Sequence, residues 1–387
     1  MSDLQWLFLV LAILYGWECA CWIRRGSVAC RTWLGRRWRI LHPGNLLGNQ
    51  RGGFVFASPL PPLGGLVGGN QFPFSLSPNA VLTYVATSVN PGGQPIQVAR
   101  YIPLAEIRSV SVKGHRLLVN GQLLFKAAST TYAAFLAKQL RQLSQLPVDK
   151  RSAAIDEIFR ANFDQAAVES RWQAFQAQIA PVRRFANILF VYLFVLAPFL
   201  IWRLGFKQCW LELLIGLLLL TTTTGVLFWR VHKQFYSEAE DDRFTQTLVV
   251  MLSPPSTMRV HDILSRPLLE AFHPLAVAFV FCSKEAFQQF ARNILLDNRN
   301  PCRPACPGND TGWRETELFS RNALLRNVEE FLGRNGVDVE EICQPPVAAD
   351  ATCLSYCPRC NAQFTTTNGQ CLDCGGVPLV TFKPPKG

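Results

Sequence analysis

Four cysteines near the C-terminus have the spacing of a metal-binding site. They form two Cys-x-x-Cys pairs, Cys357 with Cys360 and Cys371 with Cys374, and ten residues separate the pairs. Four thiolates at this spacing bind one metal ion in a tetrahedral arrangement, typically zinc, and leave no open position for a catalytic water. The spacing therefore predicts a structural zinc site, with iron held by the same four sulfurs as the alternative.

The chain around these cysteines resembles a zinc ribbon. In such knuckles the residue after the second cysteine often has a positive φ, which Gly375 adopts freely and Asn361 tolerates better than most residues. The resemblance covers residues 356–382 only. It implies a small module within residues 353–387, which a linker at residues 344–352 joins to the rest of the chain.

The charge of this module disfavours nucleic acid as its partner. Between the first of the four cysteines and Gly376, the only charged side chains are Arg359 and Asp373. Phosphate contacts require lysine and arginine, so such a surface is better suited to contact with another protein. We therefore expect a protein partner for the module.

Other parts of the sequence give weaker chemical signals. Cys302 and Cys306 form a Cys-x-x-x-Cys pair, and with Cys343 and Cys353 they leave a second metal site open, although scattered free thiols explain them more simply. The 13 cysteines are an odd number, which fits a reducing compartment better than disulfide pairing. No HExxH, GxSxG, GxGxxG or P-loop motif is present, so the sequence assigns no catalytic or cofactor-binding residue.

Three apolar runs are long enough to cross a membrane, whose hydrocarbon core of about 30 Å requires roughly 20 apolar residues. Residues 4–23 contain Glu18 as their only charge, and residues 185–202 and 209–229 are two more runs joined by a short polar link. The second and third runs predict a helical hairpin. The first is predicted to be an uncleaved anchor and not a signal peptide, because Asp3 precedes it and arginines follow it.

Basic residues beside these runs predict their orientation. Cytoplasmic flanks of membrane spans carry an excess of lysine and arginine. A basic juxtamembrane segment at residues 24–52 follows the first run, Arg183 and Arg184 precede the second, and Arg230 and Lys233 follow the third. An outer N-terminus and a cytoplasmic C-terminus satisfy all three spans, so we expect a multi-pass protein of a bacterial inner (plasma) membrane.

The positive charge of the chain is concentrated beside the first span. The formal net charge is +11, and the whole surplus of lysine and arginine lies within residues 24–150. Because the span holds this segment at the membrane, the anionic inner leaflet is favoured as its partner over nucleic acid.

Residues 53–146 are predicted to form a small β-rich domain that ends in a helix. Short runs rich in β-branched and aromatic residues alternate with Pro/Gly stretches, and Asn120-Gly121 is a strong signal for a two-residue hairpin turn. Strands closed by one amphipathic helix resemble the bacterial pleckstrin-homology-like (PH-like) fold, above all in residues 102–114, and another small barrel or roll is the alternative. The expected strands are residues 54–57, 80–87, 97–102, 107–112, 117–119 and 123–125.

Most of the remaining chain is predicted to be helical. Residues 148–180 have a single apolar stripe, which either packs into a core or forms a self-association seam. Residues 235–343 are predicted as a helical cytosolic region. In it, residues 283–296 and 315–332 are the clearest helices, and Gly333 is expected to end the second.

The sequence thus predicts an α+β membrane protein with three transmembrane helices, a PH-like domain, a helical cytosolic region and a C-terminal zinc ribbon. We expect a membrane-anchored scaffold or regulatory protein that presents the PH-like and ribbon modules to a protein partner, and the missing catalytic motifs argue against an enzyme. Three alternatives stay open: an enzyme with an unrecognised site in residues 235–343, a membrane-tethered nucleic-acid binder, and a subunit of a transport complex. Nothing in the sequence identifies a reaction, a substrate or an oligomeric state.

Overall fold

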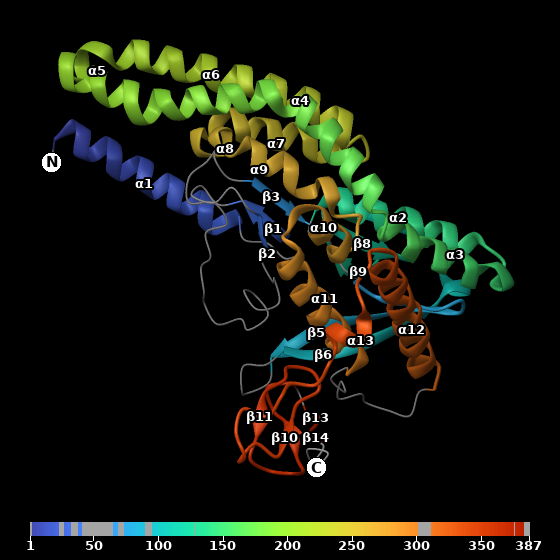
Figure 1. Ribbon diagram of the computed structural model, residues 1–387. Coiled ribbons are helices and arrows are strands. Elements are labelled where there is room, and N and C mark those ends of the chain that lie inside the picture. Colours follow the sequence, from blue (N-terminus) through green and yellow to red (C-terminus); the bar gives the residue numbers. More distant parts are fainter. Residues whose placement is uncertain are drawn as a thin grey trace. The chain divides into compact units, whose positions relative to one another are not determined.

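The structure is a computed structural model in which the chain is rich in helices and holds several small sheets (Figure 1). The chain divides into two compact units. Unit 1 comprises Met1–Phe72, Arg108–Gln142 and Asp164–Ser283, and unit 2 comprises Pro73–Ile107, Leu143–Phe163 and Lys284–Gly387. The residues that the structure describes are 2–22, 27–31, 38–40, 65–68, 73–89, 95–127, 129–300, 311–374 and 376–382.

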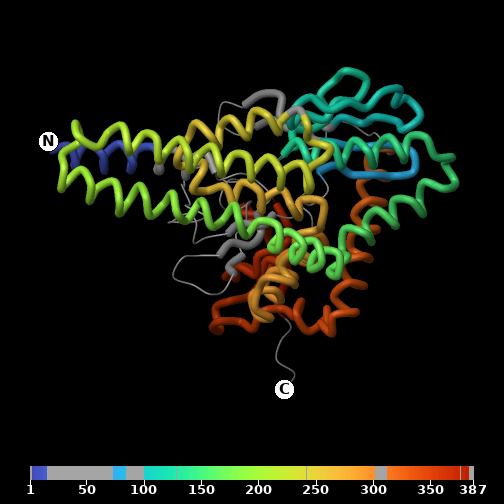
Figure 2. The backbone as a smooth tube through the Cα atoms, turned by 90° about the horizontal axis from the view of Figure 1, so that it is seen from above, coloured from blue at the N-terminus to red at the C-terminus, as the bar shows by residue number. Residues whose placement is uncertain are grey.

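A helical hairpin is the longest feature of unit 1. Its first arm consists of α4 (Gln165–Val191), the π-helical turn η3 (Tyr192–Leu196) and α5 (Ala197–Leu204), and its second arm is α6 (Phe206–Phe235). The π-helical turn comes just before Pro198, whose ring and missing N–H do not fit a regular helical turn. Gly205, with a φ of 82°, reverses the chain between the arms. The arms lie side by side in both views (Figures 1 and 2).

Both arms are long and apolar enough to cross a membrane. The candidate spans are Gln165–Leu204, of 40 residues, and Phe206–Phe235, of 30 residues. Large apolar side chains such as Phe199 and Leu219 are exposed on the arms, whereas Leu189 is buried. A contiguous apolar surface of this kind marks a site that meets a membrane or another protein.

The helix α1 (Asp3–Trp22) is a further apolar helix of unit 1. It contacts α5, and its N-terminal end lies at the same end of the unit as the tip of the hairpin in both views (Figures 1 and 2). Trp6 and Ile13 are exposed. Only Asp3–Leu14 counts as an apolar helix among the described side chains, and this is shorter than a span. The first predicted span therefore stays a prediction.

The chain after the hairpin folds back on it. Its elements are α7 (Glu240–Leu252), α8 (Pro254–Met258), α9 (Val260–Ser265), η4 (Arg266–Leu269) and α10 (Pro274–Phe281). α7 and α8 contact α6, and α8, α9 and α10 contact α4. The helical content agrees with the sequence prediction for this part of the chain.

Two small antiparallel sheets lie in the described part of unit 1. Their strands are β1 (Ser27–Arg31), β2 (Trp38–Ile40) and β3 (Gly65–Gly68), and β7 (Val110–Lys113), β8 (Arg116–Val119) and β9 (Gln122–Lys126). The first sheet has the order β2-β1-β3, and its strands β1 and β2 belong to the predicted basic juxtamembrane segment, the rest of which lies outside the described residues. The second has the order β7-β8-β9, and Asn120 (φ 51°) and Gly121 (φ 78°) form the predicted turn between β8 and β9.

Unit 2 combines a sheet, several helices and the cysteine module. Its elements before the module are β4 (Ser75–Leu76), β5 (Ala80–Val89), β6 (Pro95–Pro103), η2 (Leu104–Glu106), α3 (Val148–Asn162), α11 (Lys284–Arg299), α12 (Thr311–Arg334) and α13 (Val339–Ile342). The sheet has the antiparallel order β4-β5-β6. The strands expected for the PH-like domain are thus divided between the two units, and that fold stays a prediction. Its first expected strand, residues 54–57, lies outside the described residues.

The apolar stripe at residues 148–180 belongs to two helices and not to one. α3 ends at Asn162, and Asp164 begins α4 by accepting a hydrogen bond of 3.0 Å from the Ala167 N–H. α4 then continues through Pro181 into the first candidate span. The aspartate is a strong helix cap, and this local signal interrupts an apolar pattern that looked continuous.

The two clearest predicted helices correspond to α11 and α12. α12 does not end at Gly333 but continues to Arg334. The positive φ that ends it occurs at Gly336 (69°), and the Val337 N–H donates to the Leu332 carbonyl at 3.0 Å. Two glycines lie close together here, and only the second has the left-handed conformation that closes a helix.

The helix α2 (Thr130–Gln145) follows β9 and begins where the sequence offers a hydroxyl cap. Ser129 Oγ accepts a hydrogen bond of 3.1 Å from the Tyr132 N–H, and so satisfies one of the free donors of the first turn. The buried residues Tyr132, Leu136 and Leu140 recur at helical spacing along one face of α2.

Candidate metal centre

The cysteine module is built from short antiparallel strands. These are β10 (Ser355–Tyr356), β11 (Gln363–Phe364), β12 (Gln370–Cys371), β13 (Val377–Pro378) and β14 (Val380–Thr381). β10 pairs with β11 and β14, and β12 pairs with β13. Each Cys-x-x-Cys pair therefore lies at a turn between two paired strands.

Backbone hydrogen bonds shape the first turn. The Cys357 N–H donates to the Ala362 carbonyl, and the Asn361 N–H donates to the Cys357 carbonyl, each at 2.9 Å. Asn361 has a φ of 59°, as predicted for the residue after the second cysteine of the pair. The chain therefore reverses immediately after Cys360.

The second turn follows the same plan. The Gly376 N–H donates to the Cys371 carbonyl at 2.9 Å, and Gly376 has a φ of 87°. A Cβ at this position would lie 3.2 Å from the Gln370 side-chain oxygen, so both space and conformation favour glycine. Gly375, to which the sequence assigned the positive φ, lies outside the described residues.

The four predicted ligand residues lie together. Their Sγ atoms are all within 4.8 Å of one another, and the sulfurs of Cys360 and Cys371 are 3.8 Å apart. Zinc holds four thiolates tetrahedrally at about 2.3 Å, which corresponds to sulfur–sulfur distances of about 3.8 Å. The cluster therefore has the size of a four-sulfur site and can hold a metal ion.

The electrostatics of the cluster favour a bound cation. Burial raises the pKa of the Cys360 thiol, and burial together with the hydrogen bonds to the other sulfurs strongly raises the pKa of Cys374. At Cys357 burial also raises the pKa, but the backbone N–H groups of Cys360 and Arg359 donate to the sulfur and leave the pKa below its usual value. Metal ligands must be deprotonated, and a cation among the sulfurs offsets the cost of gathering four thiolates.

Little apolar core supports the module apart from its cysteines. Val377 is buried with three of them, and Phe364 and Leu379 pack against this cluster. The rings of Tyr356 and Phe382 pack with their centroids 5.1 Å apart. Small folds with a core of this size normally need a disulfide or a metal to offset chain entropy, so a metal at the four sulfurs fits the packing as well as the geometry.

The first cysteine turn is held against the end of α11. Arg359 Nε pairs with Asp297 at 2.7 Å, and Asn300 Nδ2 donates to the Pro358 carbonyl at 3.2 Å. Pro358 and Arg359 are the two residues between the first pair of cysteines. These contacts join parts of the chain about 60 residues apart, 62 in the case of the ion pair, so no local sequence pattern signals them.

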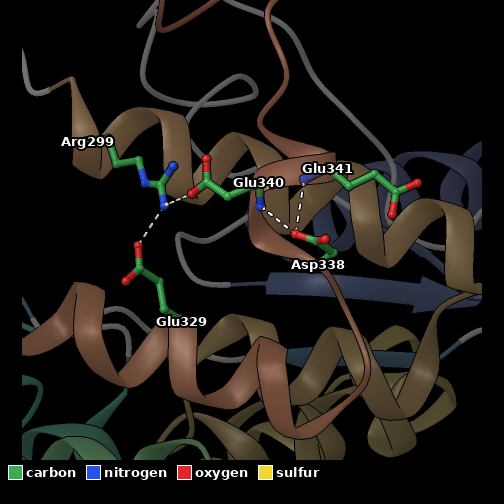
Figure 3. Close-up of polar contacts among 5 residues, drawn as sticks. All are labelled: Arg299, Glu329, Asp338, Glu340 and Glu341. Carbon is green, nitrogen blue, oxygen red and sulfur yellow. Dashed lines mark hydrogen bonds and ion pairs between the residues drawn. The ribbon is translucent and has the colours of Figure 1, made fainter.

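α11 is in turn tied to its neighbours by Arg299. Its guanidinium group pairs with Glu329 of α12 at 2.8 Å and with Glu340 of α13 at 3.3 Å (Figure 3). The hydrogen bond to Glu329 is the main cause that raises the pKa of Arg299. Asp338 caps α13 by accepting hydrogen bonds from the N–H groups of Glu340 and Glu341. Exposed ion pairs contribute only about 0–1 kcal/mol each, so these contacts orient the helices more than they stabilise them.

The other predicted thiols do not join the cluster. Among the described residues, no second group of three or more His, Cys, Asp or Glu side chains is placed to hold a metal ion. Cys343 and Cys353 are free thiols, and burial raises the pKa of Cys343. Cys302 and Cys306 lie outside the described residues, so the possible second site stays a prediction.

A cavity of ≈ 220 Å³ in unit 1 bears on the enzyme alternative. Its lining includes Tyr132, Arg171, Tyr236 and Glu270. Burial raises the pKa of both tyrosines, so they stay protonated. Tyr236 donates to a backbone carbonyl and Glu270 accepts from a serine hydroxyl. Neither tyrosine is activated as a nucleophile, and the hydrogen bonds of Tyr236 and Glu270 are those of structural residues.

No protein-family model, curated protein or solved structure matches this chain, so its own residues carry the functional argument. The structure brings together all four cysteines that the sequence singled out. It adds Asp297 and Asn300, which position the first turn and which sequence reasoning missed.

Proposed function

We propose that this chain is a membrane-anchored scaffold that holds a zinc ribbon in the cytosol for a protein partner. The observation that carries the proposal is the presence, on one chain, of a membrane-length hairpin and a four-sulfur cluster. The hairpin provides an anchor. The cluster is closed by four sulfurs and has no position for a substrate, which is typical of structural and not of catalytic metal sites.

Zinc is the metal that we propose for the cluster. A tetrahedral set of four thiolates suits zinc or iron, and the Sγ separations fit the zinc–sulfur distance. Elemental analysis of the purified full-length protein distinguishes the two. We expect one zinc per chain, and a stoichiometric amount of iron would overturn this assignment.

Three spans with the N-terminus outside give the topology that we propose. The N-terminal end of α1 lies at the same end of unit 1 as the hairpin tip at Gly205 (Figure 2). The other ends of the apolar runs at residues 185–202 and 209–229 are flanked by the exposed residues Arg183, Arg184 and Arg230, as cytoplasmic ends of spans are. A reporter that is active only outside the cytosol should therefore be active at Gly205 and silent at Gly387, and the opposite pattern would invert the orientation.

The sheet of β7, β8 and β9 supports the anionic inner leaflet as a partner. In the strand register Lys113 lies opposite Arg116, and Arg116 lies opposite Lys126. All three side chains are exposed. Like charges directly opposite each other destabilise a sheet, whereas each base near an anionic membrane surface gains about 1 kcal/mol. Anionic headgroups would thus offset the repulsion, in keeping with the inner leaflet as the partner expected for residues 24–150.

A protein partner suits the surface of the module better than nucleic acid does. Leu372 lies between the second pair of cysteines, and its side chain is 88% exposed. Arg359, the basic residue of the cysteine turns, is already paired with Asp297. One exposed leucine is ordinary on a protein surface, but here a rigid turn presents it on a nearly neutral face. We propose Leu372 as an anchor for the partner.

Co-purification from gently solubilised membranes tests the scaffold proposal. The full-length wild type, Leu372→Ser and Val347→Ser are compared, because Val347 is equally exposed (89%) but precedes the module. We expect a stoichiometric partner with the wild type and with Val347→Ser, and its loss with Leu372→Ser although the metal is retained. If the wild type retains no stoichiometric partner, the chain is not a scaffold of this kind.

A further inference from the structure

The chain after the hairpin returns along the face of α6. Arg243 of α7 lies over the ring of Trp229, with 5.5 Å between the guanidinium carbon and the ring centroid. Nearer the other end of α7, a Cβ at Gly225 would lie only 2.4 Å from Met251 Cγ. Glycine therefore lets α7 pack directly on α6, and α7 runs antiparallel to it from the level of Trp229 toward the middle of the arm (Figure 1).

The end of α8 lies level with the middle of both arms. Met258 is fully buried (0% exposed) and packs with Leu189 and Leu193 of the first arm. Leu217 and Leu220 of α6 pack against the same cluster. All four leucines belong to the apolar runs that the sequence predicts as spans. Where the arms cross the hydrocarbon core, α8 lies at the same depth.

The chain from Phe244 to Met258 can also lie against lipid without exposing a charge. No charged side chain occurs in residues 244–258. Leu252, at the end of α7, is 73% exposed, and the other large apolar residues exposed on this helix are Phe244, Leu248 and Val249. Spacings of four, five and eight residues place these side chains on one face of the helix. In water this face would be a costly apolar stripe.

Side-chain hydroxyls at the turn between α7 and α8 form hydrogen bonds with backbone groups of the same turn. Ser253 Oγ accepts a hydrogen bond of 3.4 Å from the Ser256 N–H. Thr257 Oγ1 donates to the Ser253 carbonyl at 3.1 Å and to the Val250 carbonyl, near the end of α7. The two prolines after Ser253 have no N–H to satisfy. Hydrocarbon offers no hydrogen bonds, so a helix break at membrane depth requires internal partners of this kind.

We propose that α7 and α8 form the entering part of a re-entrant hairpin, which enters the bilayer from the cytosolic side, bends at Ser253 and turns back after Met258. This inference rests on the proposed membrane anchoring of the chain. It differs from the sequence prediction, which placed the whole of residues 235–343 in the cytosol. The segment ends at Arg259, which is buried and pairs with Asp262 at 3.6 Å, so the first charge after the turn is shielded from lipid.

Lipid acyl chains are the occupant of the exposed face of α7. Val226 and Trp229 are exposed on the part of α6 beside α7, so the stripe of α7 continues the apolar surface of the arms. Because the exposed face of α7 is continuous with the proposed spans, it should contact the same lipid acyl chains. A second copy of the chain on this face is the competing occupant.

Photo-cross-linking in intact membranes tests the proposal with the full-length chain. A benzophenone-bearing phenylalanine analogue replaces Leu248 or Leu252 on α7, Leu218 on α6 as the control for the proposed span, or Val347 as the control for an aqueous site. All four side chains are exposed, so the replacements avoid the core. Mass spectrometry of the irradiated protein then shows whether each position carries a phospholipid adduct.

We expect lipid adducts at Leu248, Leu252 and Leu218, and none at Val347. Adducts at Leu218 without adducts at either α7 position would overturn the re-entrant hairpin and leave the membrane anchor intact. No adduct at Leu218 would overturn the anchor itself, and the inference with it. Cross-links from α7 to a second copy of the chain would show that a dimer contact, and not lipid, covers this face. They would also overturn the proposal.

Discussion

The cysteine module and the helical hairpin differ in what holds each of them together. The strands of the module are two residues long, and its core is little more than the cysteines, Val377 and two partly buried side chains. The arms of the hairpin hold 40 and 30 residues, and they expose large apolar side chains on their outer faces. One region buries little apolar surface, and the other exposes much of its own.

Under the proposed function, each region is completed by something outside the polypeptide. A metal ion would cross-link the four sulfurs and replace the missing core of the module. Lipid would replace water around the hairpin, and association within it would then depend on close packing and on internal hydrogen bonds, because lipid tails are as apolar as leucine. Perturbations that remove the ion or the close packing should consequently act on one region and spare the other.

Removing one sulfur should have the largest effect. Structural zinc contributes about 10–16 kcal/mol to the folding of small modules, so Cys360→Ser should release the metal and unfold the module as a whole. Elemental analysis should fall from one metal per chain to none, and limited proteolysis should cut within residues 353–382. Helix content and membrane retention should not change.

Cys343→Ser is the matched control, because Cys343 is a thiol of unit 2 outside the cluster. It should keep the metal and the protease resistance of the wild type. If Cys360→Ser also kept both, the module would not depend on a metal ion, and the contrast between the two regions would be wrong.

Adding a methyl group between α6 and α7 should have an intermediate effect. Gly→Ala within a helix normally stabilises a protein by about 0.4–1 kcal/mol. At Gly225, however, the new Cβ meets Met251, and overpacking of this kind costs about 1–3 kcal/mol. Gly225→Ala should lower the thermal stability of the solubilised protein and leave its metal content unchanged.

Gly333→Ala and a double variant sharpen this test. Nothing lies within 4 Å of a Cβ at Gly333 in α12, so alanine there should be neutral or stabilising. Met251→Ala should restore part of the stability that Gly225→Ala loses, because the two side chains compete for the same space. Equal effects at both glycines would show that helix propensity, and not the contact between α6 and α7, sets the result.

The two regions also differ in how much of their structure could be predicted from the sequence. Metal ligands can be recognised by their local spacing in the sequence, and all four cysteines lie together as predicted. The turn at Asn120-Gly121 and the φ of Asn361 also follow from local rules. The anchors of the first cysteine turn, Asp297 and Asn300, are distant in sequence and could not be found in this way.

Around the hairpin the sequence showed which segments are apolar but not what they pack against. Residues 244–258 belong to residues 235–343, which the sequence predicted as a helical cytosolic region. The proposed depth of this segment rests on the packing of Met258 against Leu193 and its neighbours, which no local pattern signals. The close approach of Gly225 to Met251 likewise joins two different helices, so no local pattern signals it.

Acidification should produce the smallest change in stability. This change is expected from the burial of one histidine in unit 1. His273 is buried at the start of α10, where its Nδ1 accepts a hydrogen bond of 3.2 Å from the Leu275 N–H. Burial lowers the pKa of His273 to about 3, whereas an unfolded histidine has a pKa of about 6.5. The stability that its neutral form contributes is therefore complete above pH 6.5. It falls by about 1.4 kcal/mol for each unit of pH below that value, because the unfolded chain binds a proton that the folded chain does not.

His273→Asn isolates this contribution, because asparagine also caps a helix but does not titrate in this range. Thermal unfolding of both solubilised proteins is measured between pH 7.5 and 5.5. We expect the wild type to lose about 1.4 kcal/mol more than the variant over this interval. Any acid-induced release of metal from the cysteine module occurs in both proteins and so cancels in the difference. Parallel pH profiles would mean that His273 is protonated in the folded chain, and that the interior of unit 1 is more open to water than its packing implies.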